Sequence, residues 1–109
     1  MEVLAYIDQI NQTTEVQELV EQFGPQLQNL THEDKLGFRA LLSTYTYLLG
    51  TKEEWALLGS VLDETPVQPS EELEEAIAIL EEVDPDAAEG LIEALTAQLR
   101  HANAHQGGH

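Results

Sequence analysis

Acidic side chains are the most chemically distinctive feature of this 109-residue chain, and they are concentrated in its second half. Between Glu53 and Leu99 the sequence has fourteen Asp and Glu residues and no Lys or Arg. Paired carboxylates catalyse proton transfer only where burial or a charged neighbour adjusts their pKa. Here Glu71, Glu75 and Glu82 fall on the outward side of a helical pattern. The sequence therefore predicts an exposed negative surface rather than a catalytic carboxylate pair.

The charge balance indicates which partners such a surface would bind. The net charge is −17, with only four Lys and Arg residues. A negative field attracts basic proteins and repels nucleic acid. A helix surface that only keeps a protein soluble usually mixes signs, because Glu–Lys pairs four residues apart contribute about 0.2 to 0.5 kcal/mol each. We therefore expect docking on a basic protein partner and no direct nucleic-acid binding. A purely solubilising surface and an inhibitor that mimics nucleic acid are the alternatives.

Histidines near the C-terminus are the only candidate metal ligands with regular spacing. His101, His105 and His109 are four residues apart, and imidazoles one helical turn apart can bind zinc, nickel or copper. A polar tail at the negative end of a helix also explains them. The chain has no Cys, no Gly-rich phosphate loop and no serine in a nucleophile-elbow context. We therefore expect a non-catalytic protein without a cofactor, and metal binding through these histidines remains an alternative.

Apolar residues three and four apart indicate helices along the whole chain, and no stretch shows the alternation typical of a strand. The pattern predicts an all-α fold, a compact bundle of five to six short amphipathic helices without a β-sheet. Residues 1–103 form the single helical domain and 104–109 a flexible tail. Capping residues mark the expected helix starts, which are Thr14, Thr31, Thr51, Ser70 and Asp84.

Several boundaries are also predicted. Gly24 and Pro25 should kink one amphipathic stripe into two nearly collinear helical pieces, because proline removes a backbone donor. Gly50 should end the helix that starts at Thr31. The next helix, 51–62, should place Trp55 in the core. The last helix should fray around Asn103.

Helices 31–49 and 51–62 are apolar on two sides and are expected to be central. The two acidic helices that follow should form one outer layer. The second apolar stripe would be left for a partner or for self-association as a homodimer. The candidate partner-binding residues combine this stripe with the outward acids: Leu36, Ala40, Tyr47, Leu57, Val61, Glu71, Glu75 and Glu82.

The function that the sequence favours is that of a non-catalytic protein-binding adaptor, assembly factor or regulator. The N-terminal segment lacks the basic region of a signal peptide, and no apolar run approaches the roughly 20 residues that span a bilayer. A cytoplasmic location is therefore expected.

Overall fold

The computed structural model describes residues 3–7, 12–51 and 57–106, with side chains up to residue 102. In these ranges all regular secondary structure is helical and there is no strand, which confirms the predicted fold class. The described residues form two 3-10 turns and five α-helices. In chain order the elements are η1 (Val3–Tyr6), α1 (Thr14–Phe23), α2 (His32–Thr51), α3 (Leu58–Val61), η3 (Leu62–Glu64), α4 (Glu71–Ile79) and α5 (Pro85–Gln106).

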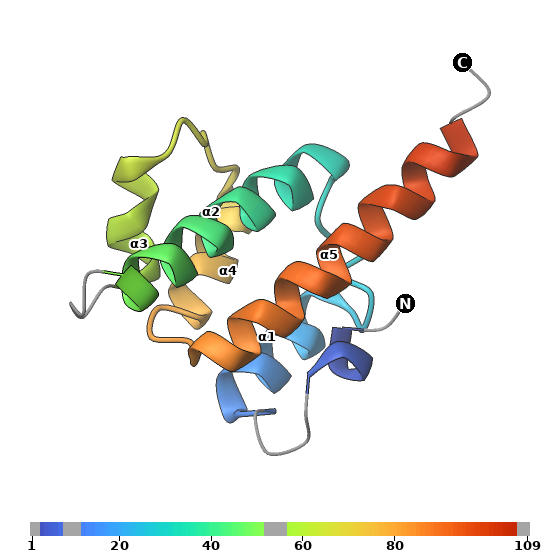
Figure 1. The fold of residues 1–109 in the computed structure, drawn as a ribbon. Helices are drawn as coiled ribbons and strands as arrows, with labels where there is room; N and C mark the ends of the chain where they lie inside the picture. Colours follow the sequence, from blue (N-terminus) through green and yellow to red (C-terminus); the bar gives the residue numbers. More distant parts are fainter. Residues whose placement is uncertain (1–2, 8–11, 52–56, 107–109) are drawn as a thin grey trace.

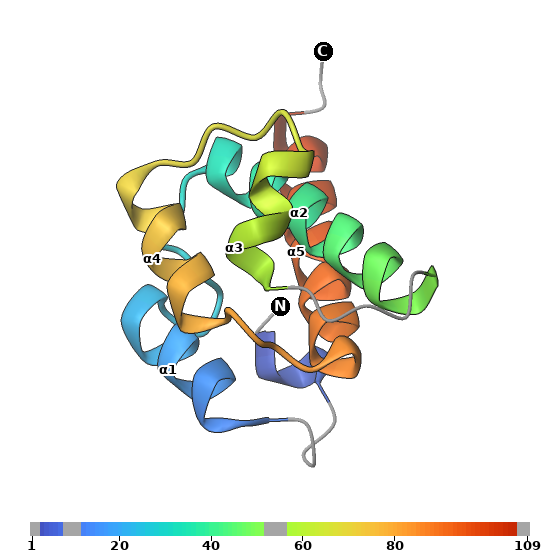
Figure 2. The same cartoon turned by 90° about the vertical axis from the view of Figure 1, so that its left-hand side faces the viewer.

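The helices form two layers with the core between them. The long helices α2 and α5 lie side by side in one layer, and α1 and α4 form the other (Figures 1 and 2). The short helix α3 contacts both α2 and α4. The acidic helices α4 and α5 thus lie in different layers, so the expectation of a single acidic outer layer was wrong.

Helix α5 is central because it is buried on two sides. Leu91 and Leu95 point into the main core, whereas Ala87 and Ala94 extend the buried surface around the helix. At Gly90 a Cβ atom would lie only 2.5 Å from the carbonyl oxygen of Tyr6. The absence of a side chain at Gly90 therefore allows the backbone of η1 to pack directly on α5. The sequence pattern showed the leucine stripe, but it did not show the small-residue side.

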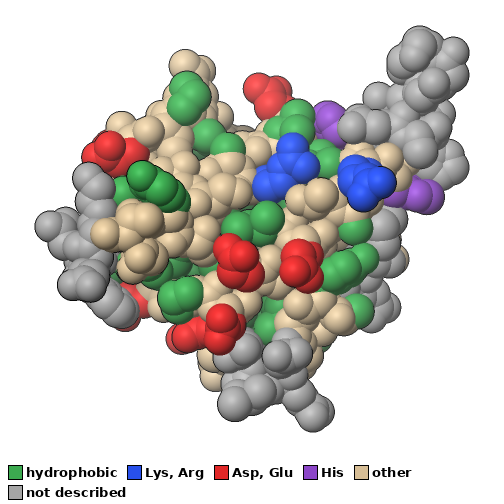
Figure 3. All heavy atoms as spheres, in the orientation of Figure 1, with side chains coloured by type: hydrophobic (Ala, Val, Ile, Leu, Met, Phe, Trp, Pro, Cys, Tyr) green, Lys and Arg blue, Asp and Glu red, His purple; other side chains and the backbone are tan. Residues whose placement is uncertain are grey.

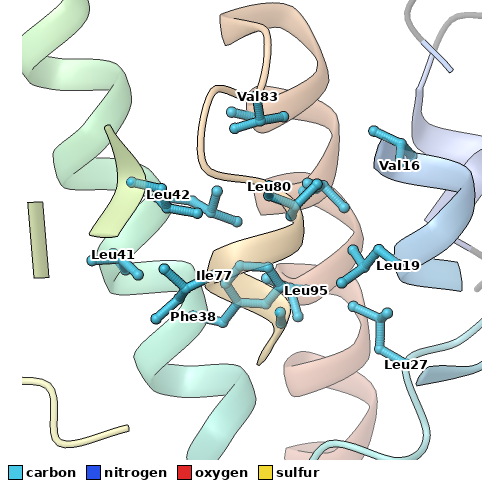
Figure 4. Packing of buried hydrophobic residues seen from close by; sticks show 14 of the residues in the cluster. Val16, Leu19, Leu27, Phe38, Leu41, Leu42, Ile77, Leu80, Val83 and Leu95 are labelled. Atoms are coloured by element: carbon cyan, nitrogen blue, oxygen red, sulfur yellow. The ribbon is translucent and has the colours of Figure 1, made fainter. Parts of the chain in front are cut away.

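Apolar side chains from both layers meet in a continuous core. Figure 4 shows Phe38 and Leu42 of α2 close to Leu80, which lies at the end of α4, with Leu19 of α1 on the opposite side. All four are 0% exposed, and so is Leu95 of α5. Burying a side chain of this kind contributes about 1.5 to 3 kcal/mol, so this cluster fixes how the two layers face each other.

The segment after α1 differs from the prediction. The helix ends at Phe23, and Gly24 follows with a φ of 96°. Residues 24–31 form turns instead of a second helical piece. The backbone at Leu27, with a φ of 52°, leaves the helical region, yet its side chain is fully buried. The apolar stripe therefore continues into the core, as predicted, although the helix does not.

Three of the predicted caps are present. Thr31 and Asp34 exchange hydrogen bonds, because the Asp34 amide donates to Thr31 Oγ1 at 3.1 Å and the Thr31 amide donates to Asp34 Oδ2 at 3.2 Å. Ser70 Oγ accepts from the Leu73 amide at the start of α4. Asp84 precedes Pro85, the first residue of α5, and Asp84 Oδ2 accepts a hydrogen bond from the Asp86 amide. These local signals fix three helix starts.

The expected boundary at residues 50–51 is wrong. Helix α2 continues through Gly50 to Thr51, and the Thr51 hydroxyl donates to the Tyr47 carbonyl oxygen at 2.7 Å. Thr51 therefore still belongs to α2, and the segment that it was expected to cap begins at residue 52, outside the described residues. Trp55 lies outside the described residues. At the other end of the chain α5 reaches Gln106, beyond the predicted fraying at Asn103.

Candidate functional site

The outward side of α2 carries the apolar strip that the sequence predicted. Leu36 is 41% exposed and Tyr47 is 62% exposed, and they are the two exposed large hydrophobic residues among those described. Ala40 and Ser43 lie between them and are also exposed. The core side of the helix, with Phe38, Leu41, Leu42 and Tyr45, faces the opposite way. We call the outward residues the α2 strip, and it consists of Leu36, Ala40, Ser43 and Tyr47. No described element covers the α2 strip.

Basic residues flank the α2 strip. Lys35 and Arg39 belong to α2 and Arg100 to α5, and they are the three described Lys and Arg residues. Figure 3 shows basic side chains gathered where α2 and α5 adjoin, with acidic side chains on the same face nearer the start of α5. Sequence analysis missed this grouping, although Arg39 follows Leu36 by three residues and so must lie beside it on the helix.

Lys35, one of these basic residues, is half-buried. Its ammonium group donates to the Gln26 carbonyl oxygen at 3.4 Å. Burial lowers the pKa of Lys35 from its usual 10.5, because a charged amine is less stable away from water. Lys35 therefore ties the turn segment after α1 to the first turn of α2, and its contact is structural.

The predicted acidic residues are exposed, as expected from the sequence. Every described acid between Asp63 and Glu93 is exposed, including Glu71, Glu75 and Glu82. Helix α4 begins with three acids in its first turn, where negative charge is favourable next to unpaired amides. Among the described residues no acid of this run forms an ion pair with Lys or Arg. These carboxylates thus face solvent without a compensating Lys or Arg in the part of the chain that the structure describes.

One of these carboxylates has a contact between helices. Glu75 Oε2 accepts a hydrogen bond from Gln22 Nε2 of α1 at 2.6 Å. This contact fixes the outward acids of α4 beside α1, in the layer opposite α2. The α2 strip and the acids Glu71 and Glu75 are therefore on different sides of the molecule, and they do not make up one composite site.

The turn between α4 and α5 is anchored by a buried tyrosine. Tyr45 Oη donates to the Val83 carbonyl oxygen at 2.6 Å, and the tyrosine is 1% exposed. Burial raises the pKa of the Tyr45 phenol above its usual 10, and the neighbouring carboxylates of Glu82 and Asp84 raise it further. This bond places the acids of the turn near the C-terminal half of α2.

Two of the predicted partner-binding residues are less exposed than expected, and one of them belongs to the interior. Val61 of α3 is 1% exposed and packs in the core, which corrects its expected place on an exposed surface. Leu57, just before α3, is half-buried. The α3 backbone is held by the Leu58 amide, which donates to the Glu81 carbonyl oxygen at 2.8 Å. Among the described residues, the large exposed apolar side chains are therefore those of α2.

The described part of the chain contains no cluster of side chains arranged for metal binding or acid–base chemistry. His101 is exposed, whereas the side chain of His105 and all of His109 lie outside the described residues. No group of three or more His, Asp or Glu side chains among the described residues is arranged to hold a metal ion. Asp34 is the one buried carboxylate in the described ranges, and it serves as a helix cap.

Comparison with known proteins gives no relative. No protein-family model, curated protein or solved structure matches the chain. Within the described residues, no helix has the length and apolar content needed to cross a bilayer.

Proposed function

We propose that this protein is a non-catalytic protein-binding module whose acidic surface docks on a basic protein partner. The observation that carries the proposal is the uncompensated exposure of the acids on α4 and in the turn before α5. We call this the α4 acidic surface, and its residues are Glu71, Glu72, Glu74, Glu75, Glu81, Glu82 and Asp84.

The arrangement of these acids supports a binding role because it costs stability. Glu71 and Glu75 are four residues apart on one helix, and like charges at this spacing destabilise a helix by about 0.2 to 0.5 kcal/mol. Lys at position 75 would replace this repulsion by an attractive Glu–Lys pair, although it would remove the contact between Glu75 and Gln22. A sequence that keeps both acids gives up this gain, and a long-range attraction for a cation-rich surface offsets it.

Such a surface acts mainly on the rate of association. Exposed charges steer a diffusing partner and raise association rates by about 10- to 1,000-fold, whereas salt at physiological strength screens them beyond roughly 8 Å. The partner is accordingly expected to bind quickly at low salt and more slowly at high salt. Its dissociation rate should depend much less on salt.

Charge reversal on the α4 acidic surface tests the proposal. The partner is first recovered by pull-down at low salt, and its binding is then measured by surface plasmon resonance. Reversing Glu71, Glu75 and Glu82 to Lys should slow association about tenfold or more at low salt and have little effect at high salt. The matched control reverses three exposed acids of α1, Glu15, Glu18 and Glu21.

The control separates a local surface from net charge, because both triple variants change the total charge equally. A much smaller effect of the α1 variant would support a defined docking surface. Equal slowing by both variants would contradict it and leave only a general electrostatic effect. Displacement of DNA or RNA from the same partner by this protein, measured by gel shift, would instead identify a nucleic-acid mimic.

A further inference from the structure

The α2 strip has a twofold pattern along the helix. Leu36 and Tyr47 are equally far from its midpoint, which lies between Leu41 and Leu42, and the small residues Ala40 and Ser43 are also symmetric about it. With a rise of about 1.5 Å per residue, Leu36 and Tyr47 are roughly 16 Å apart along the axis. Large exposed side chains therefore stand at both ends and small ones in the middle.

Because this order is symmetric about its midpoint, the strip can pair in register with an antiparallel copy of itself. When two such helices pack antiparallel about the shared midpoint, Leu36 of each copy faces Tyr47 of the other. Ala40 of each copy then faces Ser43 of the other, and these small side chains let the backbones approach closely. A parallel arrangement would pair Leu36 with Leu36 and Tyr47 with Tyr47, and the same small residues would meet in the middle. Side-chain size alone therefore does not select the direction of pairing.

Electrostatics also favours this side of the molecule for self-contact. The chain has a net charge of −17, so two copies repel each other over most of their surface. Helix α2 is formally neutral, because Glu33 and Asp34 balance Lys35 and Arg39. Its acids are confined to the first turn, and Asp34 is a buried cap. The N-terminal half of the strip is flanked by Lys35 and Arg39, whereas the C-terminal half lies near Glu82 and Asp84. An antiparallel pair therefore brings the basic half of each copy against the acidic half of the other.

We propose that a second copy of this chain binds the α2 strip in an antiparallel, twofold-symmetric dimer. A symmetric interface uses the same residues of both copies. Arg39 lies one helical turn from Leu36 and can reach the face of Tyr47 in the other copy, which adds a cation–π contact. The acids of α4 itself, Glu71, Glu72, Glu74 and Glu75, lie in the opposite layer and stay exposed, so this proposal does not depend on the proposed function.

The dimer should be weak and favoured by salt. A single pair of helices buries less than the roughly 1,200 to 2,000 Å² of a standard stable interface. We expect dissociation constants on the order of 10 μM to 1 mM. Added salt screens the repulsion between the anionic copies, so association should become tighter as salt rises. This dependence is opposite to that expected for the basic partner.

Sedimentation equilibrium of the full chain, from about 10 μM to 1 mM protein at low and high salt, tests the proposal. The variants Ala40→Lys and Ser43→Glu should each weaken dimerisation, because each buries an unpaired charge. The control is Ala78→Lys, at an exposed position of α4, which should not weaken dimerisation. Circular dichroism of each variant establishes that the fold is retained.

Mixing the two variants provides the decisive measurement. In the antiparallel arrangement Ala40→Lys in one copy faces Ser43→Glu in the other, so the mixture should associate about tenfold more tightly than either variant alone. Wild-type protein that stays monomeric at about 1 mM in both salts would overturn the proposal. So would a mixture that associates no better than its components. Loss of basic-partner binding in Tyr47→Ala, with wild-type protein still monomeric, would assign the strip to that partner instead.

Discussion

Tyr45→Phe is expected to destabilise the protein by about 1 to 3 kcal/mol, because it removes a buried hydrogen-bond donor without removing apolar volume. The Tyr45 hydroxyl donates to the Val83 carbonyl oxygen at 2.6 Å. Tyr45 and Val83 are 1% and 2% exposed, so water has little access to replace the lost donor. The substitution thus leaves a carbonyl oxygen unsatisfied in the turn that joins α4 to α5.

The size of the effect is measurable against the total stability of a small domain. For a domain of this size, 1 kcal/mol shifts the melting temperature by about 4 to 8 °C. Tyr45→Phe should therefore lower it by about 4 °C or more. Tyr47→Phe is the matched control, because the same hydroxyl is removed from a residue that is 62% exposed. The control should change the free energy of unfolding by less than about 0.5 kcal/mol.

The pKa of Tyr45 adds a prediction about alkaline pH. Burial raises its folded-state pKa above the unfolded value near 10, and Glu82 and Asp84 add to the shift. As pH rises past 10, the unfolded state therefore loses this proton first, and stability falls until the folded-state pKa is passed. The Tyr45 contribution is fully present below pH 10. In Tyr45→Phe this part of the alkaline loss should be absent.

Urea unfolding followed by circular dichroism, from about pH 7 to 11, measures both effects. Lys35 titrates in the same range with the opposite sign, because burial lowers its pKa and its unfolded state holds the proton longer. The comparison is therefore between Tyr45→Phe and wild type at each pH. The reasoning would be refuted if Tyr45→Phe and Tyr47→Phe lowered the free energy of unfolding equally. It would also be refuted if the difference in free energy of unfolding between Tyr45→Phe and wild type did not narrow above pH 10.

Further substitutions test the packing and the charge distribution. Gly90→Ala should cost about 1 to 3 kcal/mol, since its Cβ would meet the Tyr6 carbonyl oxygen; Gly50→Ala, with no atom within 4 Å, should be neutral or stabilising in the same urea titration. Leu95→Ala should cost about 2 to 5 kcal/mol through the cavity it leaves, and neutrality would place Leu95 outside the core. Ser70→Ala should lose about 1 kcal/mol with the α4 cap, as chemical denaturation would show. The melting temperature should rise with sodium chloride, and a flat response would argue against crowding of the exposed acids.

The sequence by itself determined the helical fold class and much of the local structure, because the forces involved act within one or two turns. The Thr31–Asp34 exchange and the Ser70 cap each join atoms three residues apart. Apolar spacing likewise identified the core sides of α2 and α4, where Phe38 and Leu73 are buried. The exposed acids also followed from sequence, since charged side chains on the side opposite an apolar stripe remain in water.

Only the tertiary structure decided which stripes are covered, because periodicity shows that a surface is apolar without showing what packs on it. Val61 and the α2 strip had the same sequence signal, yet Val61 is buried and Leu36 and Tyr47 are exposed. The close approach of η1 to Gly90 and the bond from Tyr45 to Val83 join segments far apart in sequence. The separation of the α2 strip from the acids of α4 has the same origin. It depends on which helices pair across the core, and that is a long-range choice that no local pattern encodes.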